Sequence, residues 1–163
     1  MVPTVVRRKR TRPHFDSPQQ EAYLNLWRTY DRLRETEDEL FGRFGLTAQQ
    51  YNALRLLRAA HPTKVPTLTI AGRLISRAPD ITRLIDRLHN RGLVERERPS
   101  DNRRVVNVGI TAAGLQLLDE LANEVKTCHE KQLGHLEPAE LRKLSELLRK
   151  AREPYEPAGS TWR

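Results

Sequence analysis

Arginine and lysine side chains are concentrated in two short segments of the 163-residue chain. Residues 1–13 carry five bases and no acid, a charge of +5, and residues 72–104 carry nine bases and five acids, a charge of +4. Residues 14–71 and 105–163 contribute 0 and −1, so the two basic segments account for the formal net charge of +8. Such clustering is typical of a surface that binds nucleic-acid phosphates. The alternative is an ordinary solvated face.

The second basic segment contains a predicted helix with arginines on one side. An apolar stripe recurs at helical spacing and is expected to face the core: Ile81, Leu84, Ile85 and Leu88. The outward side then carries Asp80, Thr82, Arg83, Asp86 and Arg87. Arg83 can donate two hydrogen bonds to a guanine, Thr82 can contact a thymine methyl group or a phosphate, and Arg87 can bind the DNA backbone. In the alternative interpretation, these side chains form only pairs on the helix surface.

Two residues at the start of this helix have further interpretations. Arg77 precedes the helix and is predicted to lie near base edges. The carboxylate of Asp80 suits the positive end of the helix dipole, or it accepts a hydrogen bond from a cytosine amino group. We prefer the dipole interpretation of Asp80.

The tip of a predicted hairpin carries Asp101, Arg103 and Arg104. A guanidinium group at such a tip can enter the minor groove, whose negative potential attracts it. In the alternative, Asp101 only supports the turn. The basic N-terminal arm also has two interpretations, because a tail attracted to any polyanion and a specific arm in a groove share this composition.

Periodicity and capping residues predict the elements that position these side chains. Thr47 and Gln50 are spaced as a capping box, Thr67 and Thr111 are predicted N-caps, and Pro79 is predicted at a first helical position. We expect helices over 17–44, 47–60 and 67–74, from 79 to the closing Gly92, from 111 and after 138, with strands over 93–98 and 106–110. Residues 64–66 are expected to be a connection. The order predicts a mainly α fold with six helices and a small β-hairpin, in which a helix-turn-helix is followed by a wing.

Composition excludes several classes of protein. Apolar residues make up 37% and charged residues 31%, which is enough apolar material for one packed domain. No apolar run approaches the roughly 20 residues of a membrane span, and the first residues lack the apolar core of a secretory signal. We therefore expect a cytoplasmic protein without a membrane partner. Cys128 is the single cysteine, so an internal disulfide and a thiolate zinc cage are excluded.

We expect neither an enzyme nor a cofactor or metal site. The sequence contains no Gly-rich phosphate loop, HExxH pair, nucleophile elbow or Cys–His constellation. His129 and His135 are six residues apart, which places them on different faces of a helix. His89 is predicted to be a surface residue or a phosphate contact.

Three motifs follow one another along the chain: FGLTAQQYNALRLL at 44–57, DITRLIDRLHNRGLVERE at 80–97 and DNRRVVNVGITAAG at 101–114. In this order and spacing they resemble the MarR-type winged helix-turn-helix regulators of bacteria. The resemblance spans roughly residues 20–152. It implies an obligate homodimer whose two recognition helices enter successive major grooves of a pseudo-palindromic operator. It also implies control of transcription, often repression relieved by a small molecule.

The resemblance also implies a division of the chain and a role for the wing. Residues 17–152 are expected to form one winged helix-turn-helix domain, with dimerisation helices at 17–44 and 111–152 and a DNA-binding lobe at 46–110. Residues 1–16 and 153–163 are then a basic flexible arm and a flexible tail. By the same resemblance, Asp101 orients Arg103, and Arg103 enters the minor groove.

An effector pocket is expected between the dimerisation helices and the DNA-binding lobe, again by resemblance. The candidate lining residues are Trp27, Tyr30, Arg34 and Tyr51, and the implied ligand is a small aromatic or lipophilic molecule. Core packing explains these aromatic residues equally well. Peroxide-sensing relatives use a cysteine near the first helix, where this chain has none. Cys128 lies on a later apolar stripe, where a buried inert thiol is favoured over a redox sensor.

The main competing hypothesis is a winged-helix module that acts architecturally or as a protein adaptor, without sequence preference or ligand. Competition by unrelated DNA separates the two. A regulator should prefer its own site by about a thousandfold or more.

Overall fold

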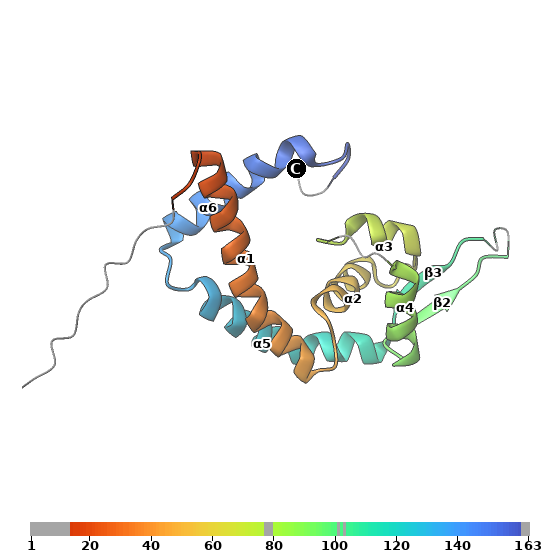
Figure 1. Cartoon of the computed structure of the whole chain (residues 1–163). Helices are drawn as coiled ribbons and strands as arrows, with labels where there is room; N and C mark the ends of the chain where they lie inside the picture. The colour runs from red at the N-terminus through yellow and green to blue at the C-terminus, as the bar shows by residue number, and fades with distance from the viewer. Residues whose placement is uncertain (1–13, 77–79, 101, 103, 161–163) are drawn as a thin grey trace, which may run out of the picture. The chain divides into compact units, whose positions relative to one another are not determined.

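A computed structural model of the chain describes residues 14–76, 80–100, 102 and 104–160. The elements, coloured along the chain in Figure 1, are α1 (Pro18–Arg43), α2 (Ala48–Ala60), β1 (Val65–Pro66), α3 (Thr67–Arg73), α4 (Ile81–Asn90), β2 (Val94–Glu97), β3 (Asn107–Ile110), α5 (Ala112–Leu133), α6 (Pro138–Arg152) and a 3₁₀ turn, η1 (Glu153–Tyr155). The chain divides into two compact units between Arg34 and Glu35, within α1. The mainly α fold with six helices and a β-hairpin, predicted from the sequence, is confirmed for the described residues.

The helix boundaries follow from local capping chemistry. At the start of α2, Thr47 Oγ1 accepts a hydrogen bond from Gln50 N at 3.2 Å, and Gln50 Oε1 accepts one from Thr47 N at 2.9 Å. This is the predicted capping box, which satisfies two of the helix's free N–H groups. Thr111 caps α5 through Gly114 N at 3.1 Å. Gly92 follows α4 with a φ of 70°, a conformation that glycine adopts without strain.

Two predictions about capping are wrong. The side chain of Thr67 does not cap α3, because Thr67 is the first helical residue and its hydroxyl donates to Val106 O at 3.0 Å, which fastens α3 to the wing. Helix α4 begins at Ile81 rather than at Pro79, because Asp80 is its N-cap. Pro79 itself lies outside the described residues.

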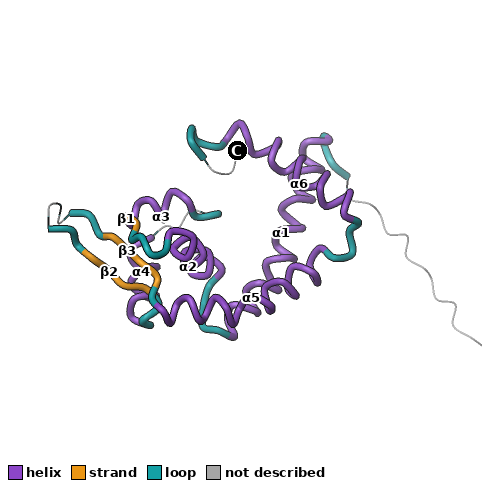
Figure 2. Tube along the Cα trace, turned by 180° about the vertical axis from the view of Figure 1, so that it is seen from behind, coloured by secondary structure: helices purple, strands orange, loops and turns teal. Residues whose placement is uncertain are grey.

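The sheet has three strands, in the order β1-β3-β2, one more than the predicted hairpin (Figure 2). Strands β2 and β3 are antiparallel, with Val94 paired with Ile110 and Glu97 with Asn107. The connection predicted at residues 64–66 contributes β1, which pairs antiparallel with β3 through Val65 and Val108. A two-residue strand shows no alternation, so periodicity could not reveal it.

One continuous core lies among the helices and sheet of residues 35–163. The largest fully buried side chains are Leu54, Leu57, Ile70, Ile85, Leu88, Val94, Val108 and Leu121. They come from α2, α3, α4, α5 and both strands of the hairpin, so α4 and the wing pack on the same core. Helix α6 differs, because none of its residues is buried.

Candidate nucleic-acid interface

Helix α4 has the two faces that the sequence predicts. Leu84, Ile85 and Leu88 are buried, whereas Thr82, Arg83 and Arg87 are exposed. Because the three buried residues recur at helical spacing, burying them turns the intervening polar residues outward. Neither Arg83 nor Arg87 forms an ion pair with any described residue, so both guanidinium groups are available to another molecule.

The carboxylate of Asp80 is used inside the protein. Its Oδ1 atom accepts a hydrogen bond from Arg83 N at 2.8 Å, which makes Asp80 the N-cap of α4. A carboxylate at this position also interacts favourably with the helix dipole. The geometry favours the capping interpretation of Asp80 over a contact with cytosine.

Asp86 forms an ion pair with Arg96 of β2, and not with an arginine of its own helix. This contact fastens α4 to the wing. Sequence reasoning missed Arg96 as a functional residue, although Val94 and Arg96 alternate on one face of a predicted strand. That alternation would have turned Arg96 toward the side of the sheet that buries Val94, where α4 packs.

Arg104 lies beside β3 at the described edge of the hairpin tip. Its side chain is exposed, and its backbone N–H donates to Asn102 Oδ1 at 3.2 Å. Val105 N donates to Asn102 O at 3.1 Å, so Asn102 supports the turn by both its side chain and its backbone. Asp101 and Arg103, predicted as a pair at this tip, lie outside the described residues.

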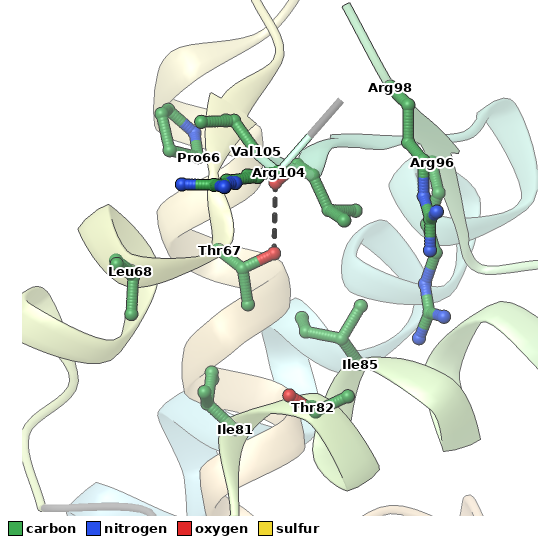
Figure 3. A pocket seen from close by; sticks show the side chains of 11 residues that line it. Pro66, Thr67, Leu68, Ile81, Thr82, Ile85, Arg96, Arg98, Arg104 and Val105 are labelled. Atoms are coloured by element: carbon green, nitrogen blue, oxygen red, sulfur yellow. Dashed lines mark hydrogen bonds between the residues drawn. The ribbon is translucent and has the colours of Figure 1, made fainter. Parts of the chain in front are cut away.

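A cavity of about 380 Å³ is bordered by α3, α4 and the wing (Figure 3). Its walls include Leu68 of α3, Ile81, Thr82 and Ile85 of α4, and Val105 and Val106 before β3. Three arginines from the wing also line it, namely Arg96, Arg98 and Arg104. The cationic side chains of the wing and Thr82 of the polar face of α4 therefore border one depression.

The turn between α3 and α4 is fastened to α2 by side-chain hydrogen bonds. Asn52 Oδ1 accepts from Ile75 N at 3.0 Å, and Gln49 Nε2 donates to Ser76 Oγ at 3.2 Å. These contacts set the path of the chain as it leaves α3. Arg77, predicted to reach base edges, lies outside the described residues, as does the basic arm at 1–13.

The acids of β2 do not line this depression, and both of them pair with one lysine. Lys64 Nζ contacts Glu95 Oε1 at 3.2 Å and Glu97 Oε2 at 2.8 Å. Hydrogen bonds to Glu97 and then Glu95 raise the pKa of Lys64 above its usual value of 10.5. The side chain of Lys64 passes over Gly109, where a Cβ would lie 3.0 Å from Lys64 Cγ. The wing's two carboxylates are thus matched to one ammonium group.

The four candidate effector residues fall in different units. Trp27, Tyr30 and Arg34 lie on the first part of α1, where Trp27 and Tyr30 are 61% and 58% exposed. Tyr51 lies on α2, stacks on Phe41 with ring centroids 4.5 Å apart, and has a pKa raised mainly by burial.

A second cavity, of about 480 Å³, lies between α2 and α5. It is lined by Tyr51, Arg55, Arg58, Ala59, Leu118 and Ala122. Arg58 forms an ion pair with Asp119 at 2.9 Å, whereas Arg55 has no ion pair with a described residue. A pocket that combines all four predicted residues stays a prediction.

Two further sequence expectations concern Cys128 and metal binding. Cys128 is buried, as its place on an apolar stripe predicts. Within the described ranges, no group of three or more His, Cys, Asp or Glu side chains is placed to hold a metal ion. No helix in the part of the chain that the structure describes is long and apolar enough to cross a membrane.

Comparisons with known proteins find winged-helix regulators. A model of the MarR family matches residues 46–106. The crystal structure of a MarR transcription factor from Planctomyces limnophilus is 60% identical, has a TM-score of 0.68, and covers 83% of this chain and 98% of that chain. Bordetella bronchiseptica BpsR, whose DNA binding is regulated by 6-hydroxynicotinic acid, is 26% identical, with a TM-score of 0.72 and coverage of 85% and 96%. The transcriptional repressor MprA from Escherichia coli K12 is 24% identical over 139 residues, which are 84% of this chain and 79% of that protein.

Proposed function

Because the chain belongs to the MarR family of DNA-binding transcription regulators, we propose that it acts in the cytoplasm as a homodimeric repressor of a pseudo-palindromic operator. The observation that carries the proposal is the free cationic face of α4. Asp80 caps the helix and Asp86 binds Arg96, which leaves Arg83 and Arg87 without an acidic partner among the described residues. The repressor MprA supports the direction of regulation, since it is a relative over most of the chain.

On α4, Thr82, Arg83 and Arg87 have distinct roles in the proposed complex. Arg83 lies in the first turn, where a recognition helix contacts base edges, and donates two hydrogen bonds to a guanine. Thr82 contacts a thymine methyl group or a phosphate. Arg87 lies one turn further along and binds the backbone, which fixes the register without reading sequence. Arg77, before the helix, also reaches the base edges.

The wing contacts the adjacent minor groove in this proposal. Asp101 orients Arg103, and Arg103 enters the groove, with Arg104 beside it. The exposure of Arg104 and the presence of Arg98 in the lining of the nearby cavity support a cationic wing. The competing acids, Glu95 and Glu97, are engaged by Lys64.

A second copy of the chain is the proposed partner of the uncovered apolar side chains. On α6, Leu144 and Leu147 are 37% and 51% exposed, and no residue of this helix is buried. Within the first unit, Leu26, Trp27 and Tyr30 are also exposed. Exposed apolar side chains that gather on one helix mark an interaction surface, and a second copy of the chain would bury them in the proposed dimer.

Selection from a random duplex library, followed by anisotropy titration, tests the function. The dimer should enrich an inverted repeat whose half-sites are centred about one helical turn apart, and it should bind this repeat about a thousandfold more tightly than unrelated DNA. Light scattering should give twice the chain mass at micromolar concentration. Binding without sequence preference would favour the architectural alternative, and a monomeric mass would refute the assembly.

A small aromatic or lipophilic effector is the proposed signal, and it releases the operator. Support comes from BpsR, whose DNA binding responds to an aromatic acid, and from the cavity beside Tyr51 and Arg55. The pocket is proposed to include Trp27, Tyr30, Arg34 and Tyr51. An effector lowers operator affinity only as far as it binds the DNA-incompatible geometry more tightly. Titrating benzoate and nicotinate derivatives into the protein–operator complex tests this, and no release by any of them would count against it.

A further inference from the structure

Arg91, which follows α4, is hydrogen-bonded to the turn at the end of α1. Arg91 Nη1 donates to Gly45 O at 2.6 Å, and Arg91 Nη2 donates to Phe44 O at 3.0 Å. Phe44 and Gly45 form the turn between α1 and α2, where Gly45 has a φ of 64°. The guanidinium also packs against Gly45, since a Cβ there would lie 3.6 Å from Nη1. One side chain therefore joins the C-terminal end of α4 to that of α1.

Gly92 and Leu93, the next two residues, accept hydrogen bonds from Thr111 at the start of α5. Thr111 Oγ1 donates to Gly92 O at 2.7 Å, and Thr111 N donates to Leu93 O at 3.1 Å. Gly114 packs so closely here that a Cβ would lie 2.3 Å from Leu93 O. We call this set of contacts the α4 junction, formed by Phe44, Gly45, Arg91, Gly92, Leu93 and Thr111.

The contribution of Arg91 differs from the rest of the α4 junction. The Thr111 and Leu93 contact uses backbone atoms, and the Thr111 hydroxyl also caps α5. Arg91 instead supplies two charge-assisted hydrogen bonds from one planar group, which fix direction as well as distance. Its side chain is exposed and contributes little to the core. The position of α4 can therefore depend on Arg91 without the fold depending on it.

The α4 junction lies at the C-terminal end of α4, so a small rotation there displaces the N-terminal end of the helix. Helix α4 has ten residues, which corresponds to about 15 Å of length. A tilt of about 10° at its C-terminal end would move its N-terminal end, with Thr82 and Arg83, by about 2.6 Å. That displacement is close to the rise of one base pair, which is about 3.4 Å. In a dimer, a displacement of this size at both recognition helices would alter the half-site spacing that fits.

We propose that Arg91 is a positioning residue that fixes the angle of α4 against the ends of α1 and α5 and thereby sets the half-site spacing that the dimer accepts. This inference rests on the proposed function, because it requires two recognition helices on one operator. Arg91 does not touch the bases in this role. It restricts the geometries in which Arg83 of both protomers can bind at once.

Spacing discrimination is the readout that tests the role of Arg91. The probes are the inverted-repeat duplex selected by the wild-type protein and the same duplex with one base pair inserted at its centre. Wild-type protein should prefer the first, and in Arg91→Met this preference should fall by about tenfold, a typical coupling between two sites. Arg91→Lys keeps a donor and should retain part of the preference. Lys126→Met makes an equal charge change at an exposed site on α5 and should keep the wild-type spacing preference. Because α5 belongs to the proposed dimerisation helices, light scattering must first show that this variant still forms the dimer.

The outcomes separate positioning from general weakening. If Arg91→Met binds both duplexes more weakly by the same factor, or binds as wild type does, the inference is wrong. Thermal melting and light scattering on each variant identify loss of fold or of the dimer, and Arg91→Lys supplies the comparison if Arg91→Met unfolds. Wild-type protein that binds DNA without spacing preference would overturn the proposed function itself, and this result appears before any variant is made.

Discussion

Asparagine in place of Asp86 should destabilise the protein more than methionine in place of Arg96, although the two residues form one ion pair. The side chain of Arg96 is 27% exposed, and that of Asp86 is 47% exposed. Arg96 Nε is buried with no hydrogen-bond partner among the described residues, and Nη2 contacts the carboxylate without an aligned hydrogen bond. The guanidinium therefore depends on Asp86, whereas the carboxylate is open to water.

The two magnitudes follow from what each substitution leaves behind. Asp86→Asn leaves a largely buried cation without its counter-charge. Breaking a fully buried pair costs about 3–5 kcal/mol, and the partial exposure of this pair reduces the expected cost to about 1–2 kcal/mol. Arg96→Met leaves a carboxylate that water can solvate and retains apolar contact with the cavity wall, so it should cost less than about 1 kcal/mol.

Urea unfolding followed by circular dichroism measures both values. The protomer concentration must be equal in all samples, because the stability of a dimer depends on it. In thermal melting, the expected shifts are about 3–6 °C for Asp86→Asn and below about 3 °C for Arg96→Met. A loss for Arg96→Met that equals or exceeds the loss for Asp86→Asn would refute the reasoning, because it would show that the carboxylate is the dependent partner.

Three further predictions concern the DNA-facing lobe. Arg83→Ala should weaken binding to the selected operator by about 1–3 kcal/mol and relax the sequence preference, whereas Arg87→Ala should weaken binding to all DNA sequences alike and reduce the salt slope by about 1. Anisotropy titrations over a series of salt concentrations distinguish the two variants, and identical profiles would contradict the assignment. Arg103→Ala should abolish tight operator binding but leave the dimer mass and melting unchanged, and unaltered affinity in a gel shift would reject the role of the wing. Lys64→Met should lower the melting temperature at neutral pH and lower it by less at strongly alkaline pH. The pKa of Lys64 is raised in the folded protein, so its charge stabilises the fold at pH values below its unfolded-state pKa, and this stabilisation is lost as the pH rises through its folded-state pKa. A decrease in melting temperature that does not depend on pH would contradict this.

Local patterns predicted the elements that carry the proposed site. The stripe of α4 recurs within one helix, so its buried and exposed faces could be assigned without tertiary information. The same is true of the Thr47 capping box, in which both partners lie three residues apart. Thr67 is also a threonine at the start of a helix, but its hydroxyl donates a hydrogen bond to the carbonyl of Val106, 39 residues away, because the chain leading into β3 lies next to Thr67. A capping residue competes with such distant partners, which the sequence does not display.

The missed contacts all join residues that are distant in the chain. Strand β1 exists through its pairing with β3, and the orientation of Arg96 follows from the register of β2. Arg91 donates hydrogen bonds to backbone carbonyl groups 46 and 47 residues earlier in the chain. Every residue carries a backbone carbonyl, so the sequence gives no sign of which one will accept. Sequence reasoning therefore identified the residues that face outward more readily than those that set their position.

The acids of the DNA-binding segment show why this distinction matters for function. By formal count, they reduce the charge of residues 72–104 to +4 and should oppose phosphate binding. In the folded protein, each of the described acids is engaged inside the lobe, by a helix N-terminus, an arginine or a lysine: Asp80, Asp86, Glu95 and Glu97. Because these carboxylates are compensated locally, their field falls off quickly, and the exposed arginines act with little opposition. The same acids that lower the net charge fix α4 and the wing in place, so removing one would raise the charge and still weaken specific binding.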